Sequence, residues 1–178
     1  MLQLTRKTDY GIRLMLEVGA HGNGGMSTAE VARRQNIPYQ FLRKVVRPLV
    51  AEGLLTSRRG QGGGLSLARP PETITALDIV RAFGPASLNE CTIDPPECDR
   101  RNLCAGYGVW LEAQSSVERV LRATRLSDMV QRQAALEGAW NKRKDHRETR
   151  PSRMAGRKGP AQRVPRARHR GKEGTRYE

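Results

Sequence analysis

Residues 27–50 read STAEVARRQNIPYQFLRKVVRPLV and contain two helix signals separated by a tight turn. The segment Ser27-Thr-Ala-Glu30 has the spacing of a capping box, in which the serine side chain accepts a hydrogen bond from the backbone N–H of the glutamate. We predict a short helix over about residues 28–35. Residues 36–38 then form a turn, and Pro38 is well placed at the first position of a second helix.

The second helix of this pair is predicted to be amphipathic and basic. Apolar side chains recur at spacings of three and four from Phe41 to Val50, and we expect the helix to end at Gly53. Polar and basic residues lie between these positions. A short helix, a tight turn and an amphipathic helix with a basic outer face are typical of a helix-turn-helix that binds in the major groove of DNA. The alternative is an ordinary solvated helix surface.

A glycine-rich loop follows the second helix. We predict strands at residues 54–57 and 65–67, joined by the loop RRGQGGG at residues 58–64. Glycines allow positive φ, so this loop can close on a phosphate, and a hairpin at this place is a wing. The residues predicted to contact DNA are Ser27 and Thr28 in the first helix, Tyr39, Gln40, Arg43, Lys44 and Arg47 in the second, and Arg58, Arg59 and Gln61 in the wing.

The remaining segments predict a mainly helical protein with one small β-hairpin. Further helices are expected at residues 8–20, at 75–83, where Thr75 to Asp78 has a capping signal, and at 109–123 and 126–138. The predicted organisation is a winged helix-turn-helix domain at 1–83, a cysteine-bearing loop at 84–108, a dimerisation helix with a C-terminal helix at 109–140, and a disordered basic tail at 141–178.

Charge is distributed unevenly along these segments. Residues 1–70 carry eleven Lys and Arg against four Asp and Glu, residues 71–140 carry seven against ten, and residues 141–178 carry fourteen against four. A basic folded segment joined to a slightly acidic one suggests a DNA-binding part joined to a sensing or dimerising part. The tail is expected either to contact phosphates, which would steepen the salt dependence of binding, or to aid solubility.

Several protein classes are disfavoured by the same sequence. The chain has no apolar run long enough to span a bilayer, and its first residues lack the apolar core of a signal peptide, so we expect a cytoplasmic protein without membrane contact. We also expect no enzyme, because no nucleophile–base pair or carboxylate pair is visible. The glycine run at 60–64 lacks the Lys-Ser/Thr of a phosphate-binding loop.

Three cysteines lie within 14 residues, at Cys91, Cys98 and Cys104. Cytosolic thiols stay reduced, so these cysteines are expected to be metal ligands or redox groups rather than a disulfide scaffold. Thiolates that converge from one loop suit an iron–sulfur cluster. Zinc usually takes paired C-x₂-C knuckles, and a thiol switch needs only two cysteines within reach. The residues alone leave all three possibilities open.

Three segments followed by three cysteines carry a family resemblance. QLTRKTDYGIR at residues 3–13, IPYQFLRKV at 37–45 and RGQGGGL at 59–65 resemble the Rrf-type winged-helix transcription regulators over roughly residues 1–135. The opening LTRKTDYG resembles most the branch of nitric-oxide-sensing repressors, NsrR. The cluster-assembly branch, IscR, is less similar.

This resemblance implies a homodimeric repressor that binds a double-stranded DNA operator and senses nitric oxide, an oxidant or iron status. It implies an iron–sulfur cluster, either 4Fe-4S or 2Fe-2S, on Cys91, Cys98 and Cys104. In the IscR branch a histidine three residues after the last cysteine is a ligand, and Tyr107 occupies that position here. In the NsrR branch an aspartate of the partner subunit serves instead, and the matching residue is Asp9. The alternative is that Asp9 interacts favourably with the dipole of the first helix.

Overall fold

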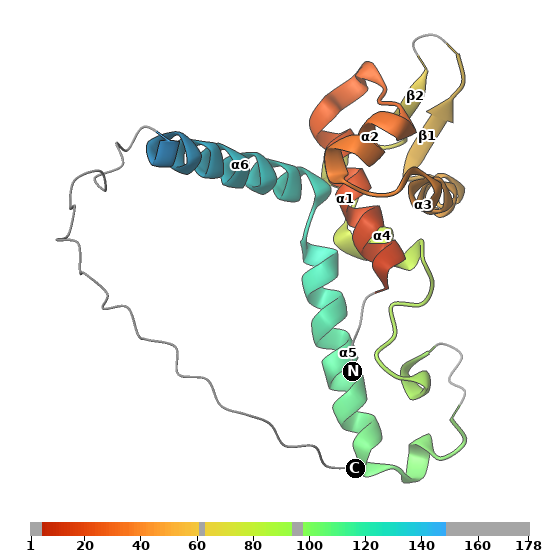
Figure 1. Ribbon diagram of the computed structural model, residues 1–178. Coiled ribbons are helices and arrows are strands. Elements are labelled where there is room, and N and C mark those ends of the chain that lie inside the picture. Colours follow the sequence, from red (N-terminus) through yellow and green to blue (C-terminus); the bar gives the residue numbers. More distant parts are fainter. Residues whose placement is uncertain (1–4, 61–62, 94–97, 149–178) are drawn as a thin grey trace, which may run out of the picture. The chain divides into compact units, whose positions relative to one another are not determined.

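The computed structural model describes residues 5–60, 63–93 and 98–148 (Figure 1). The chain divides into two units, residues 1–141 and residues 142–178. The helices are α1 (Arg6–His21), α2 (Thr28–Gln35), α3 (Tyr39–Ala51), α4 (Ala76–Arg81), α5 (Ala105–Ala123) and α6 (Leu126–Glu148), and the strands are β1 (Leu55–Arg58) and β2 (Gly64–Leu67).

The two strands form the predicted antiparallel hairpin, with Leu55 opposite Leu67 and Arg58 opposite Gly64. The fold is therefore mainly helical with one small hairpin directly after a helix-turn-helix, as the sequence predicted. Short 3₁₀ turns lie at Gly22–Gly24, Pro71–Thr73, Glu90–Thr92 and Arg101–Leu103.

One apolar core joins the helix-turn-helix to the hairpin and to α4. Its side chains come from α1, α2, α3, both strands, α4 and the first residue of α6, and from the connecting residues Met26, Ile37, Leu54 and Ile74. Burying a leucine or isoleucine side chain completely contributes about 1.5–3 kcal/mol, so this core holds the winged helix together. The largest fully buried side chains are Leu14, Met15, Met26, Leu42, Leu49, Leu54, Leu55, Leu65, Ile74, Leu77, Ile79 and Leu126.

The hairpin is held against the residue that precedes α2. Met26 and Leu65 exchange two backbone hydrogen bonds, with N···O distances of 3.0 and 2.8 Å. At Gly64, φ is +149°, and a Cβ atom there would lie 2.9 Å from the backbone of Met26. A glycine is therefore required at this position, both for its dihedral angle and for the close approach of the two backbones.

The junction between α5 and α6 is tied to the start of α4. The Ala76 N–H donates to the Thr124 carbonyl, and the Leu126 N–H donates to the Ile74 carbonyl, both at 2.9 Å. The helix α4 begins at a complete capping box between Thr75 and Asp78, as predicted. These bonds fix the end of α5 and the first turn of α6 against the winged helix.

Several helix ends differ from the predictions. The first helix starts at Arg6, because the Thr5 side chain caps it. Pro38 occupies the N-cap position of α3 rather than its first helical position. The helix α5 starts at Ala105 rather than at 109, and α6 continues to Glu148 rather than ending near Gly138. A single glycine costs about 1 kcal/mol in a helix, which the good helix formers that follow it can offset.

The described helices include none that combines the length and apolar character needed to cross a membrane. The predicted disordered tail began at residue 141; residues 141–148 belong to α6, and residues 149–178 lie outside the described residues.

Candidate nucleic-acid interface and cysteine loop

The helix-turn-helix begins at Ser27, whose Oγ accepts a hydrogen bond from the Glu30 N–H at 3.1 Å. This is the first half of the predicted capping box. The Glu30 carboxylate pairs with Arg34 at 3.0 Å instead of returning to the backbone. The helix α2 ends at Asn36, which adopts a left-handed conformation with φ of 50° and so makes the tight turn before α3.

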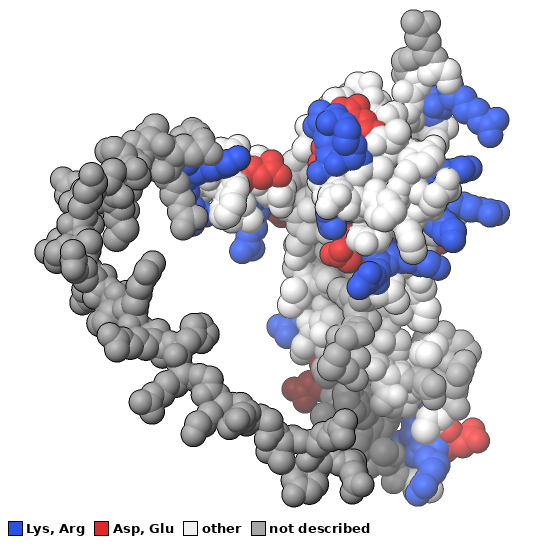
Figure 2. Space-filling view, viewed as in Figure 1, with Lys and Arg blue, Asp and Glu red and all other residues white. Residues whose placement is uncertain are grey.

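The helix α3 is fixed by one buried face and presents the opposite face to solvent. Leu42, Val45 and Leu49 are completely buried. The five polar side chains that were predicted to contact DNA from this helix are all exposed: Tyr39, Gln40, Arg43, Lys44 and Arg47. Figure 2 shows Lys and Arg side chains gathered along the edge formed by α3 and the hairpin.

The described residues provide no acidic partner for the cations of this edge, whereas Arg13, Arg34, Arg69, Arg81 and Arg122 are each paired with a carboxylate. Within the described part of the chain, no Asp or Glu forms an ion pair with the exposed cations of α3 or with Arg58 and Arg59 of the hairpin. By contrast, Arg34 on α2 lies 3.1 Å from Glu17, and this hydrogen bond raises the pKa of Arg34. An unpaired cationic edge retains its full attraction for phosphates.

Two aromatic rings add apolar surface to α3. The Arg43 guanidinium lies 6.0 Å from the centroid of the Tyr39 ring, and the Lys44 ammonium lies 5.8 Å from that of Phe41. The sequence placed Phe41 in the buried stripe, but its side chain is 55% exposed. Successive helical residues differ by about 100°, so Phe41 lies to one side of the face centred on Leu42 and Leu49. Sequence analysis therefore missed an exposed aromatic residue beside the basic face.

The other predicted DNA-contacting residues lie at the edges of this surface. Ser27 is exposed and Thr28 is half-buried at the start of α2, where backbone N–H groups and the helix dipole favour a phosphate. Arg58 and Arg59 are exposed at the end of β1. Gln61 lies outside the described residues.

The three cysteines lie between α4 and α5. Cys91 belongs to the turn Glu90–Thr92 and is half-buried, as is Cys98, whereas Cys104 is exposed directly before the first residue of α5. All three thiols are free of disulfides. Three free thiols on one loop are a donor set that an iron–sulfur cluster accepts.

The described geometry does not gather these thiols. No group of three or more His, Cys, Asp or Glu side chains that could hold a metal ion occurs among the described residues. Residues 94–97, which lie between the first two cysteines, are not described. The chemistry of the donor set therefore fits a cluster, while the arrangement of the described loop does not assemble a site.

Asp9, the proposed further ligand, and Tyr107, which stands where the IscR branch has a histidine, lie on different helices. Asp9 lies in the first turn of α1, as the dipole alternative requires, and its carboxylate is 61% exposed and 3.9 Å from Arg13. Tyr107 is half-buried in the first turn of α5.

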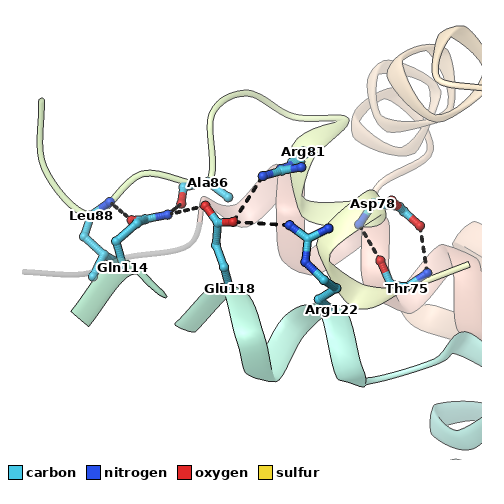
Figure 3. A network of polar contacts seen from close by, with 8 residues as sticks. All are labelled: Thr75, Asp78, Arg81, Ala86, Leu88, Gln114, Glu118 and Arg122. Carbon is cyan, nitrogen blue, oxygen red and sulfur yellow. Dashed lines mark hydrogen bonds and ion pairs between the residues drawn. The ribbon is translucent and has the colours of Figure 1, made fainter. Parts of the chain in front are cut away.

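A residue that sequence analysis missed connects the loop to α5. Gln114 is 8% exposed, and its side-chain amide hydrogen-bonds to the backbones of Ala86 and Leu88 at the start of the loop (Figure 3). It also contacts Glu118, which pairs with Arg81 at the end of α4. No local motif predicts these contacts, because the backbone partners of Gln114 lie 26 and 28 residues away in the sequence.

Residues 4–132 match the family Rrf2, described as an iron-dependent transcriptional regulator. The protein Rrf2 of Nitratidesulfovibrio vulgaris is 34% identical over 131 residues, which cover 72% of this chain and 87% of that protein. The solved structure of CymR, the global cysteine regulator of B. subtilis, has a TM-score of 0.60 and 33% identity, covering 74% of this chain and 98% of CymR. The structure of IscR from T. potens has a TM-score of 0.58 and 28% identity, covering 73% and 87% of the two chains.

The family match spans the winged helix, the cysteine loop and α5. These relatives share its mainly helical fold. The chain belongs to the Rrf2 family of DNA-binding, winged-helix transcriptional regulators.

Proposed function

We propose that the protein is a homodimeric repressor in the cytoplasm, and that the chemical state of its cysteine loop sets its affinity for an operator. The observation that carries the proposal is the exposed face of α3, where Arg43, Lys44 and Arg47 have no acidic partner within the described residues. The first residues of such a helix contact base edges, and the later cations contact phosphates. The wing arginines extend this contact to the neighbouring backbone or minor groove.

The exposed side of α5 supports the dimer. Val109 and Val120 are 65% and 64% exposed, and Ala113 and Ser116 lie between them. These four residues are separated by four, three and four positions, the spacing of a seam between two packed helices. Small side chains in the middle of the seam would let two copies of α5 approach closely. Two recognition helices would then bind half-sites in successive major grooves of a roughly palindromic operator.

The cysteine loop is the proposed sensor. By chemistry and by family resemblance, Cys91, Cys98 and Cys104 would hold an iron–sulfur cluster, with Asp9 of the partner subunit as the proposed further ligand. The description of the family as iron-dependent supports this assignment. A cluster would supply iron sites that react with nitric oxide or oxidants, which are the proposed signals. A carboxylate ligand is exchangeable, which suits a site that must open to a small molecule.

A second candidate is a regulator that works through its thiols alone. Two observations favour it: the described loop does not gather the three cysteines, and the chain is similar to a regulator of cysteine. Cys91 and Cys98 are half-buried and free of disulfides, so a movement of the loop would let one of them form a disulfide with another of the three thiols. A zinc-stabilised loop is a further alternative that metal analysis distinguishes.

Anaerobic purification of the full-length chain tests these alternatives. Visible absorption with stoichiometric iron and sulfide supports the cluster, and nitric oxide should then bleach the colour and weaken operator binding in a gel-shift assay. A colourless protein with stoichiometric zinc would rule out the iron–sulfur cluster. A colourless, metal-free protein whose operator affinity changes reversibly with thiol oxidation would favour the thiol switch. Asp9→Ala should shorten the lifetime of the chromophore. An unchanged lifetime would favour the alternative, in which the Asp9 carboxylate interacts with the dipole of α1.

A further inference from the structure

The start of the cysteine loop is held by one buried amide. The Gln114 Nε2 donates to the Ala86 carbonyl at 2.6 Å, and its Oε1 accepts from the Leu88 N–H at 2.9 Å. The same Nε2 donates to the Glu118 carboxylate at 2.8 Å (Figure 3). A buried amide that loses its partners destabilises the fold, so these bonds fix the loop start relative to α5.

The turn that carries Cys91 is bonded to this same segment. The Ser87 hydroxyl donates to the Asn89 carbonyl at 2.6 Å and lies 2.8 Å from the Thr92 hydroxyl. The Thr92 hydroxyl also donates to the Asn89 carbonyl, at 2.7 Å. These bonds make residues 87–92 a small closed unit. This unit contains both Cys91 and Leu88, whose N–H donates to Gln114.

Glu118 continues the connection to the winged helix. Its Oε2 lies 3.2 Å from Arg81, the last residue of α4, and 3.5 Å from Arg122, which belongs to α5 itself. Beyond α4, the Phe83 ring packs so closely on α1 that a Cβ atom at Gly11 would lie 2.3 Å from it. The helix α1 in turn contacts α3. Polar bonds thus run from the Cys91 turn to α4, and tight packing continues from α4 towards the DNA-reading helix.

We propose that Gln114 and Glu118 form a relay that transmits displacement of the Cys91 turn to α4. Gln114 is a positioning residue: it acts by holding the loop start in one place. Directional hydrogen bonds suit this role better than apolar contacts, because a shift of one partner breaks or remakes a bond rather than sliding past it. The inference deepens the proposed function and rests on its claim that loop chemistry sets operator affinity.

The two arginines of Glu118 provide a matched pair of variants. Arg81→Met removes the ion pair that joins α4 to Glu118, whereas Arg122→Met removes an ion pair within α5 and leaves Arg81 in place. Both substitutions remove one positive charge beside the same carboxylate. Gln114→Leu tests the start of the relay. Matched urea unfolding curves of the two arginine variants are the control for folding, and this pair keeps the test decisive if Gln114→Leu does not fold.

The experiment uses the full-length chain with Cys98→Ser and Cys104→Ser, so that Cys91 is its one thiol. Reaction with N-ethylmaleimide joins the sulfur of Cys91 to a carbon of the maleimide double bond, and the neighbouring carbon takes up a proton. Two quantities are compared before and after this reaction: the amide hydrogen exchange of residues 76–81 in α4, and the dissociation constant for an operator selected from random DNA.

The relay predicts that modification changes exchange in α4 and changes operator affinity by about five- to 150-fold, in the parent chain and in Arg122→Met. Both responses should be lost in Arg81→Met and in Gln114→Leu. Equal exchange responses in Arg81→Met and Arg122→Met, or no response in any chain, would overturn the relay. If α4 responds through Arg81 while operator affinity stays constant, the relay stands and the claim that displacement of the Cys91 turn sets operator affinity fails. If affinity changes equally in every variant, the sensing function stands and the relay fails.

Discussion

The proposed DNA-reading face and the cysteine loop are built in opposite ways. The face lies on α3, which is held by the completely buried Leu42, Val45 and Leu49. The loop has half-buried or exposed thiols, and its start is held by polar bonds to Gln114. Apolar packing of this kind keeps one shape, whereas a few polar bonds can be exchanged for others. We therefore expect the proposed DNA-reading face to keep one shape and the loop to change its arrangement when its thiols react.

The largest expected effect separates the two regions by stability. Leu42→Ala should lower the free energy of unfolding by about 2–5 kcal/mol, because it leaves a cavity in the core under α3. Cys104→Ser should change it by less than about 0.5 kcal/mol, because the thiol is exposed. Urea denaturation of the metal-free protein measures both values. Similar losses of unfolding free energy for the two variants would contradict the difference in packing between α3 and the cysteine loop.

A second prediction tests whether the wing belongs to the rigid region. Gly64→Ala should destabilise the protein by about 1–3 kcal/mol, because alanine rarely adopts a φ of +149° and its Cβ would press on the backbone of Met26. Gly60→Ala is the control: its φ is also positive, at +99°, but no atom lies within 4 Å of a Cβ there. Thermal unfolding should show a larger loss for Gly64→Ala. Equal losses would mean that the contact with Met26 contributes nothing.

A third prediction separates base contacts from phosphate contacts on α3. Arg43→Ala should cost about 1–3 kcal/mol of binding and relax the preference at particular bases. Lys44→Ala should weaken binding to every sequence and lower the salt slope by about one. Selection from random DNA and titrations at several salt concentrations measure these effects. The roles assigned to the two residues would be reversed if Lys44→Ala changed the selected sequence and Arg43→Ala did not.

The smallest expected effect concerns the start of α2. Ser27→Ala removes the side chain that accepts from the Glu30 N–H and should cost about 0.5–2 kcal/mol of stability. Ser27→Asp replaces that acceptor and should recover most of the loss, as judged by urea denaturation. A stability unchanged by Ser27→Ala would show that water replaces the cap at this exposed position.

The sequence predicted those features that depend on neighbouring residues. The caps at Ser27 and Thr75, the hairpin and the helix-turn-helix each follow from signals a few residues apart, and the structure contains them all. Periodicity could not decide whether Phe41 belonged to the buried stripe, because it lies at the edge of that face. Gly138 was interpreted as a stop, although α6 continues past it.

The connection between the loop and the helices could not be predicted from local signals. Gln114 reaches backbone groups 26 and 28 residues away, and Glu118 pairs with an arginine 37 residues away. Such contacts depend on how α4 and α5 pack, which spacing along the chain does not reveal. The three cysteines were predicted as a group from their closeness in sequence, and the described loop does not gather them.

Operator binding by a charge-reduced α3 tests the central claim most directly. The triple variant Arg43→Ala, Lys44→Ala and Arg47→Ala is compared with Arg119→Ala, Arg125→Ala and Arg132→Ala, which removes three exposed cations from α5, from the junction between α5 and α6, and from α6. Fluorescence anisotropy with the selected operator should show a loss of about 100-fold or more for the α3 variant and little change for the control. Unchanged affinity of the α3 variant, or an equal loss in the control, would contradict the assignment of α3 as the DNA-reading helix.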